Sequence, residues 1–342
     1  MRRFAVFYFS VCVFTLGCGT EPIGNVADLP VSGSEDDSSR ANGDESFESA
    51  GSDASTVDGA DVEQSSSESS SNASMQSGDC VGRYCYVAPG AFLMGSPENE
   101  LGRKQDETQQ AVEFTYGLYV AKHEVTQRDW FRIAERREDW NASPAHFTEC
   151  GLDCPIESIN WWEALHYLNA LSERDDLTPC YVFSSCNDVP VGEGRTCGAV
   201  ALQDDRGHII EDVTACDGYR LPTESEWEYA YRANTTTALY NGNLTQATCG
   251  MDPALDAIAW YCGNSDLSTH EVGQKLPNAW GLYDMAGNVF EWCWDSYGPF
   301  KSLRGGDWHF YAKGGRAAYR FGNSAEARTP HYGFRVVRTA WQ

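Results

Sequence analysis

The chain has 342 residues and a formal net charge of −25, with 50 acidic and 25 basic residues. Two domains would fit this length, but the composition is so uneven that we expect one folded domain in the later part of the chain. The excess of negative charge argues against a nucleic acid or an anionic lipid face as partner.

The first eighteen residues have the pattern of an export signal. Two arginines precede an apolar run at residues 4–16 that is too short to span a membrane. The sequence at 15–18 resembles a bacterial lipobox, although Thr15 departs from the usual leucine, and Gly19 rather than aspartate follows Cys18. We predict a signal peptide at residues 1–18, lipidation of Cys18, and a lipid anchor in the cell envelope at the outer membrane, with simple secretion as the alternative.

Residues 19–79 are rich in Ser, Asp, Glu and Gly and contain almost no aromatic or branched apolar side chains. Such a segment cannot bury enough surface to offset its chain entropy, and its acidic side chains repel one another. We therefore predict a disordered acidic tether, followed by a folded domain at residues 80–342.

The folded part shows scattered glycines and few long periodic runs, which favours a loop-rich α+β domain. Loose alternation predicts strands at residues 113–120 and 332–338. An insertion at residues 180–216 contains a hairpin turn at residues 204–207. A Thr or Asn followed three residues later by an acid predicts three helix starts, at Thr126 with Asp129, Asn160 with Glu163, and Thr223 with Glu226.

Thirteen cysteines are present, and eleven remain when Cys12 of the signal and Cys18 are set aside. In an oxidising compartment we expect five disulfides and one free thiol, Cys293. The spacing does not fix the connectivity and lacks the tight pairs of a zinc site. Local spacing suggests the pairs Cys80–Cys85, Cys150–Cys154, Cys180–Cys216, Cys186–Cys197 and Cys249–Cys262.

Six sequence blocks resemble, in order, the formylglycine-generating enzyme or sulfatase-modifying factor family. They lie at residues 92–96, 119–126, 219–228, 278–292, 304–306 and 333–335 and span about 250 residues. The resemblance implies a single C-type-lectin-like domain with little regular secondary structure. This agrees with the loop-rich α+β domain expected from the residue pattern.

Family members that make formylglycine carry two cysteines after a Gly-Gly pair, with the spacing GG-x3-C-x4-C, and these thiolates bind copper(I). Here Phe310 and Gly315 occupy the two cysteine positions, and Asp307 stands in place of a serine. Neither Phe310 nor Gly315 can bind copper or act as a nucleophile. We therefore expect no catalytic residue of the family and no copper.

The same resemblance implies a structural calcium site. Asp284 and Glu291 would supply carboxylates, and Gly287 and Val289 would supply carbonyls, an all-oxygen set that suits calcium. The alternative is that the two acids cap a loop without metal.

Two function classes stay open. The first is a surface binding or interaction module for an unknown protein or peptide, with Asp307, Trp308 and His309 in an aromatic cleft together with Phe310 and Tyr311, although these side chains could equally be core. The second is an enzyme, either a copper-dependent formylglycine-generating oxidase with displaced ligands or another activity, with Asp307, His309 and Lys313 as acid and base.

Overall fold

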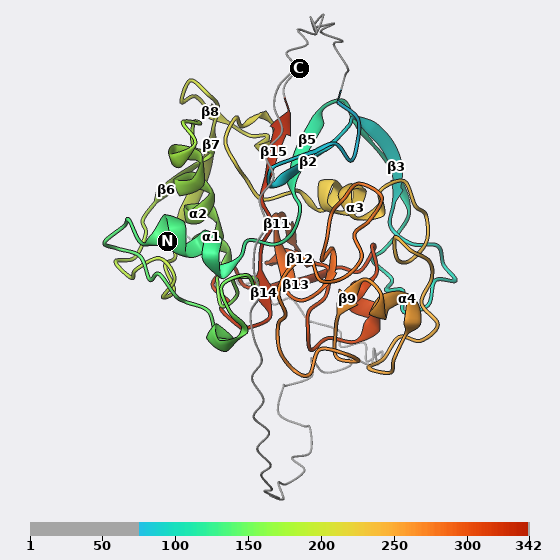
Figure 1. Cartoon of the computed structure of the whole chain (residues 1–342). Helices are drawn as coiled ribbons and strands as arrows, with labels where there is room; N and C mark the ends of the chain where they lie inside the picture. Colours follow the sequence, from blue (N-terminus) through green and yellow to red (C-terminus); the bar gives the residue numbers. More distant parts are fainter. Residues whose placement is uncertain (1–74, 341–342) are drawn as a thin grey trace, which may run out of the picture. The chain divides into compact units, whose positions relative to one another are not determined.

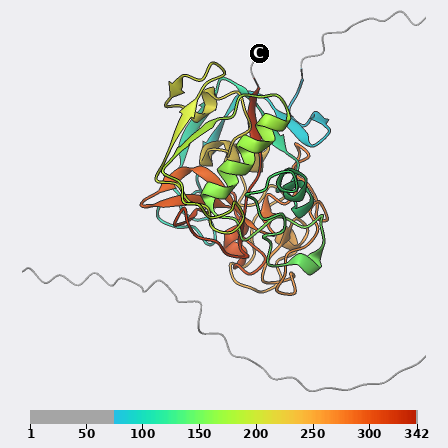
Figure 2. The same ribbon diagram turned by 90° about the vertical axis from the view of Figure 1, so that its left-hand side faces the viewer.

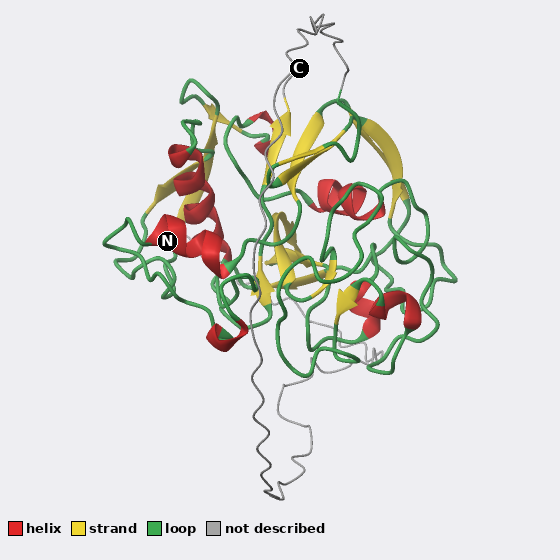
Figure 3. Cartoon of the chain, in the orientation of Figure 1, coloured by secondary structure: helices red, strands yellow, loops and turns green. Residues whose placement is uncertain are grey.

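The computed structural model describes residues 75–340, in which short helices and strands are joined by long loops (Figures 1 and 3). The predicted signal peptide, the lipidation site at Cys18 and almost all of the tether lie outside these residues. Backbone hydrogen bonds from Gly78 N to Tyr86 O and from Tyr86 N to Asp79 O, both 2.9 Å, hold residues 78–79 against the strand at Tyr84–Val87. None of the described helices is long and apolar enough to cross a membrane.

An antiparallel sheet brings the two ends of the described chain together. Its strand order is β1-β2-β5-β15, with β1 at Cys80–Val81, β2 at Tyr84–Val87, β5 at Gly117–Ala121 and β15 at Val337–Ala340. A separate hairpin pairs β3 (Gly90–Met94) with β4 (Gln110–Phe114). The last strand, β15, is thus joined to the first two strands through β5.

A second sheet lies at the centre of the fold and leads into the candidate site. Its order is β13-β12-β11-β14, with β11 at Phe290–Tyr297, β12 at Phe300–Arg304, β13 at Phe321–Asn323 and β14 at Tyr332–Gly333. Two short strands, β9 (Ala259–Trp260) and β10 (Ala286–Gly287), pair in parallel beside it. The insertion forms a further sheet from β6 (Tyr181–Ser184), β7 (Ala199–Gln203) and β8 (Ile209–Ile210), with the predicted hairpin turn between β7 and β8.

The three predicted helices are confirmed, each with a complete capping box. They are α1 (Gln127–Ala134), α2 (Trp161–Arg174) and α3 (Glu224–Arg232). A short α4 (Pro253–Asp256) and the 3-10 turns η1 (Thr148–Cys150), η2 (Val213–Ala215) and η3 (Ala312–Gly315) complete the helical structure of this range. Figure 2 shows α2 running across the near face of the molecule, where its apolar stripe, including Leu165 and Leu168, is buried.

Two strand predictions were wrong in extent. Residues 113–120 divide between β4 and β5, which belong to different sheets, and the break falls where the ring of Tyr86 packs on Gly117. The C-terminal segment divides between β14 and β15, and the residues between them, Phe334, Arg335 and Val336, are all buried instead of alternating. Backbone carbonyls of Phe334 and Val336 accept hydrogen bonds from Val125 and Ala121, so packing against a distant segment overrides the local pattern here.

All five predicted disulfides are confirmed, and Cys293 is free and buried. Burial raises the pKa of the Cys293 thiol well above its usual value. A buried, protonated thiol is a poor nucleophile and a poor metal ligand. Cys293 therefore does not replace the missing cysteines.

Candidate functional site

The loop that follows β12 contains the positions of the two missing cysteines. Gly305 and Gly306 turn the chain with φ of 95° and 79°, a region that side chains other than glycine rarely adopt. A Cβ at Gly306 would lie 2.9 Å from the carbonyl carbon of Gly314. The loop therefore folds back so closely that residues 307–311 pack against η3.

Apolar packing fills the first cysteine position. The Phe310 ring lies 5.3 Å from Phe290, 5.5 Å from Tyr319 and 6.2 Å from Phe321, measured between ring centroids. It also covers Gly314, where a Cβ would lie 2.5 Å from Cδ1 of Phe310. The space beside the loop is taken by aromatic packing rather than by a ligand-binding thiolate.

The second cysteine position has little room for any side chain. Gly315 is buried, and a Cβ there would lie 2.7 Å from Cδ1 of Leu255. Its carbonyl accepts a hydrogen bond of 2.6 Å from the Tyr231 hydroxyl, which fixes the backbone. A side chain at this position would have to displace Leu255.

The structure brings Asp307, Trp308 and His309 together with His331, a residue that the sequence did not single out. Oδ1 of Asp307 accepts from the His309 backbone N–H at 2.7 Å, and Oδ2 lies 3.0 Å from Nδ1 of His331. The rings of His331 and Trp308 stack at 4.8 Å. A histidine beside a carboxylate can move protons, but Nδ1 of His331 is not aligned for a hydrogen bond with the carboxylate.

The residues that the sequence predicted to line a cleft differ in their access to solvent. Asp307 and Trp308 are 4% and 8% exposed, so they belong mainly to the core, whereas Tyr311 is 50% exposed. His309 and Phe310 are half-buried. Lys313 lies over the Tyr311 ring, 5.7 Å from its centroid, and does not pair with Asp307. The surface that a ligand could touch is therefore formed by His309, Phe310 and Tyr311.

A buried ion pair involves one of the predicted calcium ligands. Nε and Nη2 of Arg335 donate to Glu291 at 3.1 and 2.7 Å, and Trp227 Nε1 donates to the same carboxylate at 2.7 Å. Arg335 also donates to the carbonyls of Ala121 and Tyr283, both at 2.9 Å. Glu291 is thus already balanced by a protein cation.

Two further carboxylates in this region lack such balance. Asp284 lies in the tight loop just before β10, with φ of 52°. Its Oδ2 accepts a hydrogen bond of 2.6 Å from Gly273 N, and its Oδ1 is buried without a partner. Glu124, which the sequence did not suggest as a site residue, is fully buried and neither of its oxygens has a partner. Burial raises the pKa of Asp284 to about 6. Burial and the charges of Asp284 and Glu291 raise that of Glu124 well above its usual range.

These contacts bear on whether calcium fits the predicted ligands. Three buried carboxylates, Glu124, Asp284 and Glu291, act on one guanidinium, that of Arg335, which leaves an excess of negative charge. The free oxygen of Asp284 suits a hard cation. Glu291 would have to share its oxygens between the cation and Arg335. The donor set therefore fits calcium best at Asp284.

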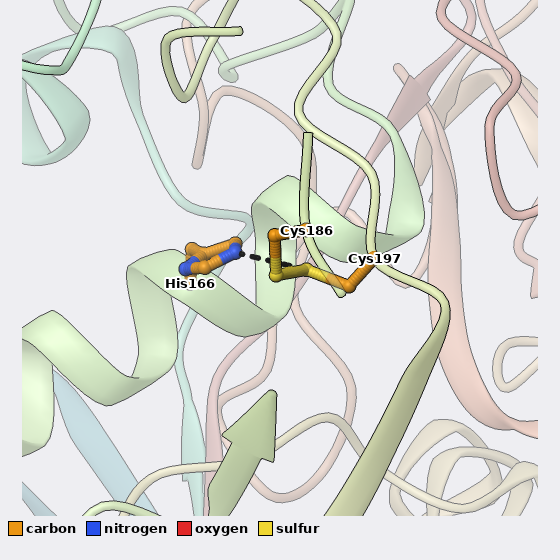
Figure 4. Close-up of side chains that lie close together, drawn as sticks. All are labelled: His166, Cys186 and Cys197. Atoms are coloured by element: carbon orange, nitrogen blue, oxygen red, sulfur yellow. Dashed lines mark hydrogen bonds between the residues drawn. A yellow bond between two sulfur atoms is a disulfide. The ribbon is translucent and has the colours of Figure 1, made fainter. Parts of the chain in front are cut away.

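A different group of potential metal ligands lies where α2 meets the insertion. Nε2 of His166 lies 3.7 Å from Sγ of Cys197, which is joined to Cys186 (Figure 4). Burial lowers the pKa of His166 to about 4, so its ring is neutral near pH 7. Because both sulfurs are held in a disulfide, they offer no thiolate, and this group serves to pack the insertion onto α2.

The comparison with protein families identifies the fold. The sulfatase-modifying factor enzyme 1-like domain matches residues 70–340. The chain belongs to this family. Treponema denticola variable protein 1 has a similar structure, with a TM-score of 0.58 and 27% sequence identity over 78% of this chain and 98% of that chain.

Relatives of the chain include proteins with and without the family's enzymatic name. It is 28% identical to the chaperone protein LppX of Paenibacillus barcinonensis over 248 residues, 65% of this chain and 80% of that protein. It is 29% identical to the formylglycine-generating enzyme of Streptomyces coelicolor over 157 residues, 36% of this chain and 48% of the enzyme. It is 33% identical to the mouse inactive C-alpha-formylglycine-generating enzyme 2 over 139 residues, 36% of this chain and 44% of that protein.

Proposed function

We propose that this chain is a binding module of the sulfatase-modifying factor family that lacks oxidase chemistry and recognises a peptide or a protein segment. The observation that carries the proposal is the packing at the two cysteine positions. Phe310 fills the space at the first position, and at the second a side chain on Gly315 would have to displace Leu255. Copper(I) chemistry needs soft sulfur ligands, and this loop supplies none.

The exposed side of the cleft suits a peptide ligand. Tyr311 is half exposed beside the half-buried rings of His309 and Phe310, and aromatic side chains give large contact areas with little loss of rotamer entropy. The name of the LppX relative, a chaperone protein, describes a protein that acts on other proteins. Both observations support a protein or peptide partner.

The proposal includes calcium as a structural ion and a lipid anchor. Asp284 would hold the ion with the carbonyls of Gly287 and Val289, and Glu291 would contribute while it stays paired with Arg335. Bound calcium would supply the positive charge that the buried carboxylates lack. Lipidation at Cys18 would place the domain at a membrane face of the cell envelope, which radiolabelled palmitate and a Cys18→Ser variant would test.

A displayed random-peptide library tests the binding function. The purified protein should enrich related peptides, and Tyr311→Ala should weaken their binding by roughly tenfold, because it removes the most exposed ring of the cleft. Phe300→Ala is the matched control, since Phe300 is 41% exposed on the hairpin between β11 and β12. A library that yields no related peptides, or equal loss in both variants, would contradict recognition by the cleft.

A further inference from the structure

A pocket of about 390 Å³ lies between the C-terminal ends of α1 and α2. It shares no residue with the cleft at residues 307–311. Its apolar lining consists of Ile133 and Ala170, which are only 5% and 3% exposed. Its charged lining consists of Arg132, Arg136, Arg137, Arg174 and Glu173.

The charge of this pocket is opposite to that of the whole protein. Four arginines and one glutamate give the lining side chains a net charge of +3, whereas the chain as a whole carries −25. Because the overall charge repels anions, an anion that binds here must be held by local contacts. Arginine is the side chain that suits this, since its planar guanidinium can donate two parallel hydrogen bonds to an oxyanion.

Two of the four arginines already hold carboxylates. Arg137 donates to Glu173 at 2.6 Å. Arg174 donates to both oxygens of Asp175 at 2.7 and 2.8 Å. These pairs show that the guanidinium groups around this pocket bind carboxylates.

The other two arginines, Arg132 and Arg136, are exposed and have no carboxylate within ion-pair distance among the described residues. Arg132 lies in the last turn of α1, where a positive charge favours the helix end. Arg136 lies beyond the end of the helix. The guanidinium of Arg136 thus has no carboxylate partner among the described residues, and it lies too far along the chain to stabilise the end of α1.

We propose that this arginine pocket binds an oxyanion through the exposed guanidinium groups of Arg132 and Arg136. The oxyanion has two sources, the carboxylates of an acidic peptide and free phosphate, which offer the same chemistry to a guanidinium. The site goes beyond the proposed cleft function and does not depend on it.

Calorimetric titration of the purified protein tests the site, with hexaglutamate and inorganic phosphate as separate probes in a phosphate-free buffer. Arg132→Ala/Arg136→Ala should raise the dissociation constant of a bound probe about tenfold. Added salt should weaken binding to the wild type. Binding of hexaglutamate alone identifies an acidic peptide as the ligand, and binding of phosphate alone identifies the free ion.

The matched control is Arg206→Ala/Arg338→Ala, which removes the same charge away from the pocket and should leave the dissociation constant unchanged. Since Arg132 and Arg136 are exposed, their variant should lose only the small contribution of Arg132 to the helix end and should melt close to the wild-type temperature, which separates lost binding from unfolding. The proposal is overturned if neither probe binds, if the pocket variant binds like the wild type, or if the control variant weakens binding equally.

Discussion

The loop after β12 and the buried charged cluster of Glu124, Asp284, Glu291 and Arg335 both include residues from sequence blocks of the family. They differ in whether their buried groups have partners. At the two cysteine positions an aromatic ring and a glycine close the structure with apolar contacts. Around Arg335, two buried carboxylates keep oxygens without partners. An apolar site closed in this way needs no ligand, whereas a buried unpaired carboxylate costs several kcal/mol unless a cation or a proton balances it.

The largest effect should come from removing the only cation of the buried cluster. Arg335→Met should lower the free energy of unfolding by about 3–5 kcal/mol, because Glu291 would stay buried without its ion pair. Urea denaturation measures this loss. Arg338→Ala is the control, since Arg338 is 29% exposed in its pair with Asp217 and should cost about 1 kcal/mol or less. Equal losses in the two variants would show that the buried pair stabilises the fold no more than the exposed pair does.

His166 lies outside both regions, and its effect on the pH dependence of stability provides a reference for them. His166 is largely buried and neutral, and burial lowers its pKa to about 4. Between pH 6.5 and 4 the unfolded chain binds a proton at this residue that the folded protein does not bind, so stability should fall as the pH falls through this window. The contribution is up to about 3 kcal/mol. His166→Phe should flatten the pH dependence of the free energy of unfolding. An unchanged slope would contradict the lowered pKa of His166 as the cause of the acid loss.

Calcium tests the charged side of the comparison. If Asp284 holds the ion, a calcium concentration of about 100 times the dissociation constant should stabilise the protein by about 2.7 kcal/mol. Asp284→Asn should abolish this gain, while Asp153→Asn, at an exposed ion pair, should keep it. Differential scanning calorimetry with calcium and with a chelator measures both. A calcium effect that survives Asp284→Asn would place the ion elsewhere.

The apolar packing is tested by adding one methyl group at the second cysteine position. Gly315→Ala should cost about 1–3 kcal/mol, because its Cβ would lie 2.7 Å from Leu255. In combination with Leu255→Val the loss should be smaller than the sum of the two single losses. Gly250→Ala serves as control, since a Cβ there meets its nearest atom at 3.4 Å, and it should change stability by less than about 0.5 kcal/mol. Strict additivity would mean that the second cysteine position is not closed by Leu255.

Local signals in the sequence predicted much of the fold. Capping boxes at Thr126, Asn160 and Thr223 predicted the three main helices. Spacing along the chain suggested the disulfide pairs, four of which join cysteines 13 positions apart or fewer and one of which spans 36. The replacement of both cysteines by Phe310 and Gly315 could also be read directly. These features depend on residues that are near one another in the sequence or on motif blocks.

The rest depended on contacts between distant residues. Arg335 approaches Glu291 across 44 positions, and Glu124 comes from a loop before α1 with no acidic neighbour that would mark it. His331 approaches Asp307 only because β14 pairs with β11. The arginine pocket requires the ends of α1 and α2 to meet. No spacing rule predicts such pairs without the tertiary fold.

We propose that this chain keeps the family fold without its oxidase chemistry. Copper(I) and a cysteine-containing sulfatase peptide are offered to the purified protein, and the peptide is followed by mass spectrometry, with the Streptomyces coelicolor formylglycine-generating enzyme as positive control. We expect no stoichiometric copper and no conversion of the cysteine to formylglycine. Bound copper with repeated turnover of the peptide would contradict this proposal.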